Sequence, residues 1–515
     1  MSAEAVRTIA ASPRCLAAVT VLVLAWALWD RVWALGRWPG INGDEAWYAV
    51  QLLRMEQGAA IPRTPTGNLP GPLHLALLWS ALAVLPRELW VLRVPSVVTS
   101  VAAMAVTYVA LRRHFGNETA RVGLLLQACL PVGIVYARLG WDTSHGPLLG
   151  ALMAWAALER RWLLLPPLVA FALWNHPTNV FVVPFLAGII LATADASASL
   201  AQAARRVVPP MIALAAALPV LVLTSSAASV VTPSQWVERA LSWQHWARFA
   251  AALGDFLAGA APFAYTAGPP LARPGTIAGW LVLAMATAIA VAGGRAAIRS
   301  SRAFSGMLAG LIGTLAGFAI VAGTRALEPH SERYAMVLVT PVVLCAAVLL
   351  GRLSTRPLAS RTGLVLSLAI GIIALGHTHV GYFRELALTG STSHRTFWTG
   401  DIEPKAAAWQ SIRDEIERRS TRTPVRVIAE DWWTLQPLLY LAHGTPGVTV
   451  RRLHGGERLR PGETAFLVGF PGGPAGKLRR ALAADTQQVR WSIPGTARAE
   501  VLEVVQVEKR ERRSR

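Results

Sequence analysis

The sequence Gly43-Asp44-Glu45-Ala46-Trp47-Tyr48-Ala49 places two adjacent carboxylates shortly after an apolar run at residues 15–35. That run is long enough to cross a bilayer as a helix, because a span needs roughly 20 apolar residues. Adjacent acids at a membrane boundary are costly unless water, a partner or a function stabilises their charge. The stretch therefore predicts a membrane helix followed either by a helix cap, with Asp44 as the N-cap and Glu45 in the first turn, or by a functional site.

The composition extends the membrane prediction to most of the chain. Of 515 residues, 54% are hydrophobic and only 15% are charged, whereas soluble proteins carry about 25% charged residues. Intrinsic disorder is excluded because it requires low hydrophobicity. A disulfide scaffold is excluded because the three cysteines (Cys15, Cys129 and Cys345) lie in separate apolar runs. The net charge of +20 is spread in short basic clusters rather than along one nucleic-acid-binding face.

Eleven apolar runs predict membrane helices. They lie near 15–35, 90–111, 119–137, 143–158, 161–175, 178–194, 207–224, 276–294, 305–323, 334–351 and 363–381. Basic clusters between them define the cytoplasmic side: Arg112/Arg113, Arg160/Arg161, Arg205/Arg206, Arg295/Arg299/Arg302 and Arg352/Arg356/Arg361. The N-terminus carries Arg7 and Arg14, and the later clusters share its side only if the additional apolar stretch Leu73–Leu85 does not span. We therefore predict that this stretch lies at the membrane interface or dips into the outer leaflet.

This topology predicts an α-helical polytopic protein of the plasma (inner) membrane with a cytoplasmic N-terminus. The transmembrane domain covers residues 1–381 and includes two extracytoplasmic segments, 36–89 and 225–275. The tail, residues 382–515, is predicted to be a small extracytoplasmic α/β domain. Its periodicity indicates a helix at 404–419 and strands at 424–431, 447–453 and 463–470.

Three further polar motifs fall on the same predicted face as Asp44. They are RLGWDTSH (138–145), WNHPT (174–178) and RALEPHSERY (325–334). Each has a structural interpretation, because Asp142 is placed to cap the next helix and Arg325 is placed to snorkel at the end of a span. The functional interpretation rests on convergence, since Asp44 and Asp142 are far apart in the chain and yet predicted at one membrane depth.

Together these motifs resemble the GT-C superfamily of integral-membrane glycosyltransferases, and more closely its bacterial branch of protein O-mannosyltransferases and the lipid A aminoarabinose transferase. The resemblance covers the layout of residues 15–381. Two departures are visible: Pro70-Gly71-Pro72 replaces adjacent prolines, and His176 stands where many relatives have lysine. The motifs that carry the resemblance are, in order, GDEAWYA (43–49), LPGPLHLALLWSAL (69–82), LRVPSVV (92–98), RLGWD (138–142) and ERYAMVLVTP (332–341).

The resemblance implies transfer of a sugar from a polyprenyl-phosphate-linked donor to a hydroxyl of an envelope lipid, glycan or protein. Asp44 matches the catalytic carboxylate of the family and is expected to be the general base of an inverting displacement. Glu45 and Asp142 are expected to be catalytic residues beside it, which shape the site or hold a cation. The expected donor-phosphate and substrate contacts are Arg333, His176, Arg325, His330, Tyr334 and Arg138. A divalent cation (Mg²⁺ or Mn²⁺) held by Asp44, Asp142 and His145 is a further hypothesis.

The main alternative is a transporter or flippase of a lipid-linked or envelope substrate. Such proteins place acids in mid-membrane and often contain repeated halves, whereas the acids here cluster near one surface and no repeat is visible. A non-catalytic relative that scaffolds an envelope complex is a third class. Two motifs in the tail are interpreted as structural: GFPGGPAGKL (469–478), which departs from a phosphate loop at Pro471 and Leu478, and the pair Trp432-Trp433.

Overall fold

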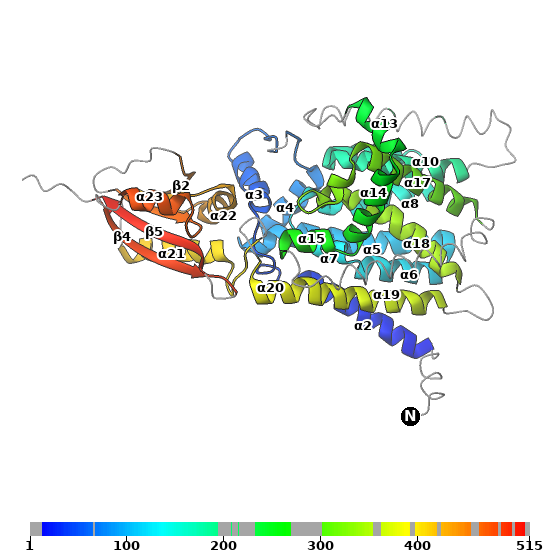
Figure 1. The fold of residues 1–515 in the computed structure, drawn as a ribbon, viewed down its shortest axis with the longest axis horizontal. Helices are drawn as coiled ribbons and strands as arrows, with labels where there is room; N and C mark the ends of the chain where they lie inside the picture. Colours follow the sequence, from blue (N-terminus) through cyan, green and yellow to red (C-terminus); the bar gives the residue numbers. More distant parts are fainter. Residues whose placement is uncertain are drawn as a thin grey trace, which may run out of the picture.

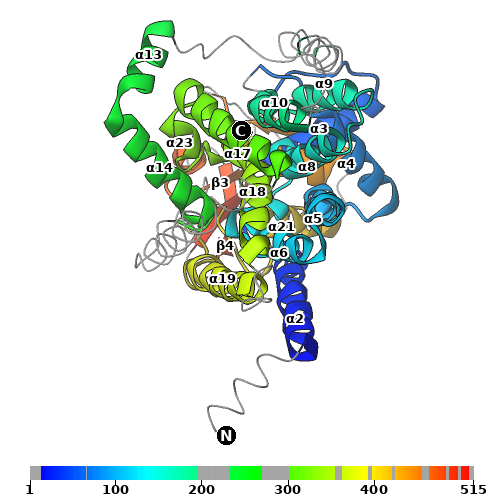
Figure 2. The same cartoon turned by 90° about the vertical axis from the view of Figure 1, so that its right-hand side faces the viewer.

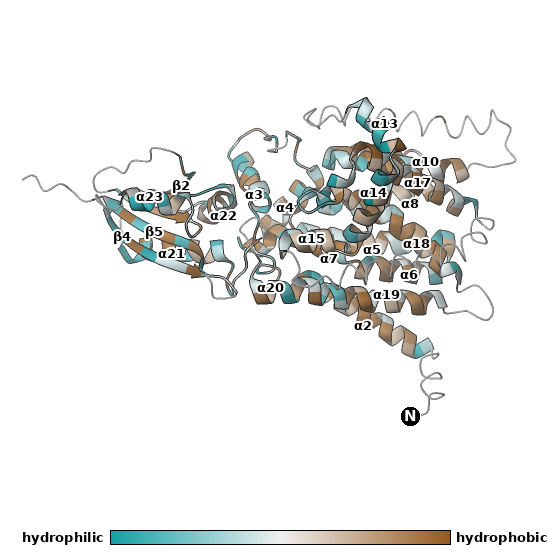
Figure 3. Ribbon diagram, in the orientation of Figure 1, coloured by the Kyte–Doolittle hydropathy of each residue, from teal (hydrophilic) through white to brown (hydrophobic). Residues whose placement is uncertain are grey.

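The computed structural model describes residues 13–64, 67–193, 208, 215, 232–268, 301–353, 362–391, 397–419, 424–454, 463–482, 486–496 and 500–509. Figure 1 shows an elongated molecule with a helical bundle at one end and a mixed α/β domain at the other. Hydrophobic residues predominate along the helices of the bundle, whereas hydrophobic and hydrophilic residues are mixed in the elements of the α/β domain (Figure 3).

Five helices in the described part of the chain are long and apolar enough to cross a membrane. They are α2 (Pro13–Val32), η1 with α5 (Leu89–Phe115), α17 (Arg302–Val321), η5 with α18 (Glu332–Arg352) and α19 to α20 (Thr362–Thr389). A sixth is added if α6 (Asn117–Cys129) and α7 (Pro131–Ala137), which are bent by 60° at Leu130, count as one span. The shorter bundle helices are α8 (Gly146–Leu158), α9 (Leu165–Asn175), η3 (Pro177–Val182) and α10 (Val183–Thr193).

The predicted count of eleven spans is not confirmed. The predicted spans 207–224 and 276–294 lie outside the described residues, apart from Val208 and Ala215. The predicted spans at 143–158 and 161–175 are interrupted at their starts, because Pro147 and Pro166 occupy first-turn positions where proline begins a helix rather than continuing one. These helices are therefore shorter than the apolar runs that predicted them.

The described basic clusters gather at the end of the bundle away from the α/β domain. Arg113 Nη1 lies 3.1 Å from Glu159 Oε1, and Arg160 Nη2 donates to the carbonyl of Thr193 at 2.6 Å. Gly351, beside Arg352, packs against Thr119. These contacts bring the ends of α5, α8, α10 and α18 together, as the predicted topology requires. Which side of the membrane this end faces stays a prediction.

The stretch predicted to lie at the interface forms α4 (Pro72–Val84). Its 13 residues extend about 20 Å at 1.5 Å per residue, which is short of the roughly 30 Å hydrocarbon core. It lies with α3 (Gly43–Glu56) at the domain end of the bundle, between the end of α2 and the start of η1 (Figure 1). α4 is therefore not among the helices long enough to cross a membrane, and its place at the interface stays a prediction.

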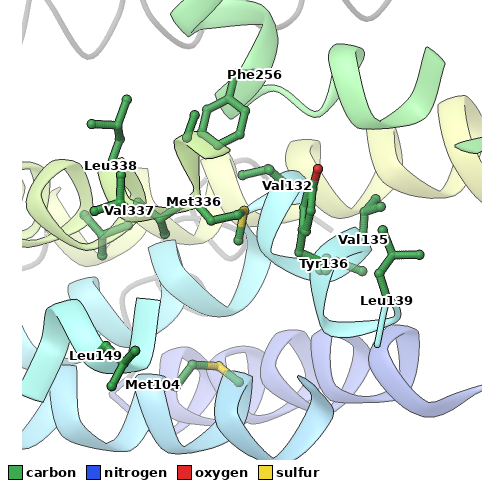
Figure 4. Packing of buried hydrophobic residues seen from close by; sticks show 14 of the residues in the cluster. Met104, Val132, Val135, Tyr136, Leu139, Leu149, Phe256, Met336, Val337 and Leu338 are labelled. Atoms are coloured by element: carbon green, nitrogen blue, oxygen red, sulfur yellow. The ribbon is translucent and has the colours of Figure 1, made fainter. Parts of the chain in front are cut away.

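Close helix packing in the bundle uses glycine. On α10 and α17, a Cβ atom at Gly188, Gly306 or Gly310 would collide with the backbone of the other helix, which is the small-residue packing that membrane helices favour. Figure 4 shows part of the core, where buried side chains from different segments converge, including Met104, Val132, Leu149, Phe256 and Met336. The segment 232–268 forms α13 (Pro233–Leu241), α14 (Trp243–Leu257) and α15 (Ala260–Thr266), with α13 and α14 along the outside of the bundle (Figure 2).

The tail domain contains a five-stranded sheet of order β2-β1-β3-β5-β4. β1 pairs in parallel with β2 and β3, and β5 pairs antiparallel with β3 and β4. The predicted helix and three strands are confirmed as α21 (Pro404–Arg419), β1 (Val425–Ala429), β2 (Val448–Arg452) and β3 (Thr464–Gly469). Four elements of the domain were not predicted from the sequence: α22 (Trp432–Ala442), α23 (Pro474–Leu482), β4 (Thr486–Pro494) and β5 (Glu500–Lys509). The segment that resembles a phosphate loop forms a turn before α23.

Candidate active site

A cavity at the domain end of the bundle gathers residues from five separated parts of the chain. Its open volume is about 650 Å³. Two of its acids, Asp44 and Asp142, come from the two motifs that the sequence placed at one membrane depth. The lining residues are Asp44, Trp47, Tyr48, Thr64, Asn68, Trp141, Asp142, Thr143, His176, Arg333 and Tyr334.

Asp44 reaches the cavity from the first turn of α3. The side chain of Asn42 caps this helix by accepting from the backbone N–H of Asp44 at 2.8 Å, and Glu45 accepts from the backbone N–H of Asn42 at 2.9 Å. The N-cap is therefore Asn42 and not Asp44, which corrects the capping interpretation. The Asp44 carboxylate instead lies 3.1 Å from Arg333 Nη1 through Oδ2 and accepts from the indole N–H of Trp432 at 3.0 Å through Oδ1.

Glu45 is a structural residue, which corrects the prediction that it acts at the site. Its side chain has 0% exposure and pairs with the equally buried Arg93, with Nε to Oε1 at 2.8 Å and Nη2 to Oε2 at 3.0 Å. The backbone N–H of Gly140 donates to Oε1 at 2.8 Å, and that of Asn42 donates to Oε2. Four donors fill the carboxylate, so none of its lone pairs is left for a cation or a substrate.

Arg138 also has a structural position rather than the predicted phosphate-binding one. The side chain is fully buried and does not line the cavity. Its guanidinium donates to the carbonyl oxygens of Asp30 at 2.7 Å and Trp38 at 2.5 Å. Arg138 therefore ties the end of α7 to the loop after α2.

Asp142 approaches the cavity from the start of the 3-10 helix η2 (Asp142–His145), where it is the first helical residue and not the cap. Burial raises the pKa of Tyr48 well above its ordinary value, and the nearby Asp142 carboxylate is the second largest cause of this increase. Asn175 Nδ2 donates to the carbonyl of Asp142 at 3.0 Å. A Cβ atom at Gly71 would lie 2.7 Å from atoms of both residues. This close approach gives a packing reason for Pro70-Gly71-Pro72.

His176 and Tyr334 form one wall of the cavity. Their rings stack with centroids 5.5 Å apart and an interplanar angle of 25°. His176 Nδ1 lies 2.8 Å from the hydroxyl of Thr178. Burial lowers the pKa of His176 below its ordinary value, so the ring is neutral at pH 7. A neutral imidazole offers a hydrogen bond to a phosphate but no cationic charge.

Arg333 is the arginine of its motif that reaches the cavity. Its guanidinium lies over the rings of Trp141, at 4.9 Å, and Tyr334, at 5.3 Å from the centroid. Arg325 and His330 are exposed and do not line the cavity, so the structure does not place them where the sequence predicted. Both residues precede η5 (Glu332–Leu338), whose first turn carries Arg333 and Tyr334 to the cavity.

The predicted metal ligands do not come together. His145 is fully buried, with Nε2 at 2.9 Å from His74 Nδ1 and Nδ1 at 2.7 Å from the hydroxyl of Thr99. Both ring nitrogens are therefore engaged away from Asp44 and Asp142. Within the described ranges, no group of three His, Cys, Asp or Glu side chains is placed to hold a metal ion. We therefore assign no chemistry to a metal at this site.

Several site residues were missed in the sequence. Trp47 and Tyr48 lie three and four residues after Asp44, a spacing that puts them near the same face of a helix, so that signal was available. Trp432 is separated from Asp44 by 388 residues, and no local pattern links them.

The architecture is similar to that of solved membrane glycosyltransferases. The structure of ArnT from Cupriavidus metallidurans bound to undecaprenyl phosphate matches 95% of this chain and 97% of its own, with a TM-score of 0.53 and 14% identity. Apo ArnT matches 94% and 97%, with a TM-score of 0.48 and 16% identity. The Archaeoglobus fulgidus oligosaccharyltransferase with Zn and sulfate matches 82% and 61%, with a TM-score of 0.43 and 13% identity.

No protein-family model matches the sequence, and no curated protein matches it. The likeness to undecaprenyl-phosphate-bound ArnT, the lipid A aminoarabinose transferase, shows the fold. The fold that the resemblance implied is therefore the fold that the chain adopts.

Proposed function

We propose that this chain is a glycosyltransferase that moves a sugar from a polyprenyl-phosphate-linked donor to an acceptor hydroxyl on the extracytoplasmic face of the plasma membrane. The observation that carries the proposal is the single cavity in which Asp44, Asp142 and Arg333 meet at one end of the membrane helices. The fold shared with ArnT, solved with undecaprenyl phosphate bound, supports the choice of donor class.

Asp44 is the proposed general base. In a single displacement, the acceptor hydroxyl oxygen attacks the anomeric carbon while its proton passes to the Asp44 carboxylate. The bond between that carbon and the phosphate oxygen breaks, and polyprenyl phosphate leaves with the electron pair. Attack opposite the leaving group inverts the configuration. Asp44 suits this role because its side chain is 27% exposed at the cavity, unlike the buried Glu45.

Arg333 is the proposed partner of the leaving phosphate. A guanidinium binds phosphate oxygens through two N–H groups and keeps its charge at any physiological pH. The side chain lies beside Asp44 and 21% of it is exposed. Arg333 thus joins the base and the leaving group in one site, where it offsets the charge that grows on the phosphate. The ring of Trp141 beneath it limits its movement.

Asp142 and the aromatic walls are proposed to bind the sugar. Asp142 offers carboxylate oxygens to sugar hydroxyls, and Trp47, Tyr48 and Trp141 offer the apolar faces on which sugar rings pack. Which sugar and which acceptor are used is a separate question. Mass spectrometry of envelope lipids, glycans and proteins from a deletion strain would identify both.

The positions of the acids favour an enzyme over a transporter. A transporter would need ionisable groups near mid-membrane. Among the five candidate spans of the described chain, the acids Asp30, Glu332 and Glu385 each lie close to one end of their helix. The ionisable groups of the cavity likewise lie at the domain end, where a lipid phosphate meets water.

The proposal is tested with Asp44→Asn in a deletion strain that supplies its own donor and acceptor. Loss of a positioned base should lower product formation about 100-fold or more. Glu328→Gln, on an exposed loop at the same end, is the matched control and should behave like wild type. Product formation by Asp44→Asn within a few-fold of wild type would refute the role of Asp44. Undecaprenyl phosphate should bind wild type more tightly than Arg333→Ala.

A further inference from the structure

We propose that Trp432 of the tail domain is a positioning residue for Asp44, so that the tail domain completes the catalytic base. The inference rests on the proposed function of Asp44 and extends it to a part of the chain that the resemblance did not cover. It is carried by one contact: the indole Nε1 of Trp432 donates to Asp44 Oδ1 at 3.0 Å across the junction of the tail and the bundle.

The two oxygens of Asp44 are held by different parts of the molecule. Oδ1 accepts from Trp432, and Oδ2 lies 3.1 Å from Arg333 Nη1. One donor therefore comes from the tail and the other from the start of a membrane helix. A carboxylate with two fixed donors keeps one orientation, whereas a half-exposed aspartate with one donor rotates among its rotamers. The orientation of the base thus depends on the tail being in place.

The start of α22 fixes the indole. Asp431 caps this helix by accepting from the backbone N–H groups of Trp433 at 3.0 Å and Thr434 at 3.1 Å, so Trp432 takes the first helical position. The backbone of α22 also packs tightly on the first turn of α3. A Cβ atom at Gly43 would lie 2.8 Å from both Cδ1 and the carbonyl oxygen of Trp432. The residue before the base therefore has no side chain, and the indole comes close enough to reach Asp44.

Further bonds tie the tail domain to the bundle around this contact. Near the end of α22, Arg87 Nη1 donates to the carbonyl of His443 at 3.1 Å, and the hydroxyl of Tyr440 donates to the carbonyl of Glu88 at 3.4 Å. Just before α3, the backbone N–H of Ile41 donates to Glu403 Oε1 of the tail at 3.2 Å. These bonds fix the tail domain against the bundle on more than one side of the Trp432–Asp44 contact.

The test compares Trp432→Phe, which keeps an aromatic ring and removes the N–H donor, with Trp433→Phe. Trp433 is the matched control because it is the next residue and packs in the core of the tail domain. The deletion strain carries each variant, and mass spectrometry quantifies the native product. Trp432→Phe should lower the rate about tenfold at an unchanged membrane level of the protein. Trp433→Phe should match wild type.

Two further measurements separate positioning from folding. Trp432→His restores a ring N–H donor and should recover part of the rate. In nanodiscs, ¹⁵N-tryptophan labelling should show an indole signal that is absent in Trp432→Phe and shifted in Asp44→Asn, which tests the contact without substrate. If Trp432→Phe does not fold, the comparison of wild type with Asp44→Asn alone decides whether an indole N–H senses Asp44.

The outcomes distinguish the inference from the proposed function. If Asp44→Asn is inactive but Trp432→Phe matches Trp433→Phe in rate, the positioning role is wrong and the base stands. If no indole signal responds to Asp44→Asn, the contact itself is wrong. If Asp44→Asn remains active, the proposed function fails and Trp432 has no base to position.

Discussion

Replacing Glu45 by glutamine should destabilise the protein strongly, although the change removes only a charge. Glutamine keeps the size of glutamate but turns one carboxylate oxygen into an NH2 group. Oε1 accepts from Arg93 Nε and Gly140 N, and Oε2 accepts from Arg93 Nη2 and Asn42 N. Whichever oxygen is replaced, two donors lose their acceptor and face another donor.

The magnitude follows from burial. Both side chains of the Glu45–Arg93 pair have 0% exposure, so water cannot replace the lost bonds. An unsatisfied buried donor costs about 1–3 kcal/mol, and breaking a buried ion pair costs about 3–5 kcal/mol. Two lost donors therefore predict a loss of about 3–5 kcal/mol in the free energy of unfolding.

The measurement is reversible unfolding in mixed detergent and SDS micelles, followed by far-UV circular dichroism. Glu56→Gln is the matched control, because it makes the same substitution at the exposed end of the same helix and should change stability by less than about 0.5 kcal/mol. The double variant Glu45→Met with Arg93→Met should be more stable than Glu45→Met alone, since it leaves no unpaired buried charge. A Glu45→Gln protein within about 1 kcal/mol of wild type would refute the reasoning.

Two predictions concern the cavity and use product formation in the deletion strain. Asp142→Asn should lower the rate about tenfold while the amount of protein in the membrane stays unchanged. The amide keeps the packing against Tyr48 but offers weaker hydrogen bonds to sugar hydroxyls. A rate equal to that of wild type would show that Asp142 does not bind the sugar. The rate of the His176→Gln variant should stay within about fivefold of the wild-type rate, and the acidic limb of its pH–rate profile should be unchanged. The reason is that burial lowers the pKa of His176, so that the ring is neutral at pH 7. A loss of rate above about 100-fold would instead indicate a cationic phosphate contact.

The sequence predicted features that local composition determines. Apolar runs marked the long helices α2, α5, α17, α18 and α19 because burial in lipid requires apolar residues along the whole helix. The distribution of basic clusters predicted that α4 does not cross the membrane, since one extra crossing would have reversed every later cluster; the helix is indeed shorter than a span. The acids Asp44 and Asp142 met because the topology placed both at one end.

Features that depend on distant partners were not predictable in the same way. Arg138 and Arg333 are both arginines at helix ends in motifs of similar appearance, yet one binds backbone carbonyls in the core and the other reaches the cavity. Only the folded surroundings distinguish them. The contact from Trp432 to Asp44 joins two domains, and no pattern within α22 signals it.

The two adjacent acids of the opening motif have opposite surroundings, and helix geometry explains why both are present. Successive residues of an α-helix point about 100° apart, so Asp44 and Glu45 cannot face the same space. Glu45 points into the protein, where Arg93 and two backbone N–H groups hold it. That buried network fixes the first turn of α3 against the loop at Gly140, two residues before Asp142. The buried Glu45 thereby sets the position of Asp44. The same network holds Asp44 and Asp142 at a fixed separation in the cavity.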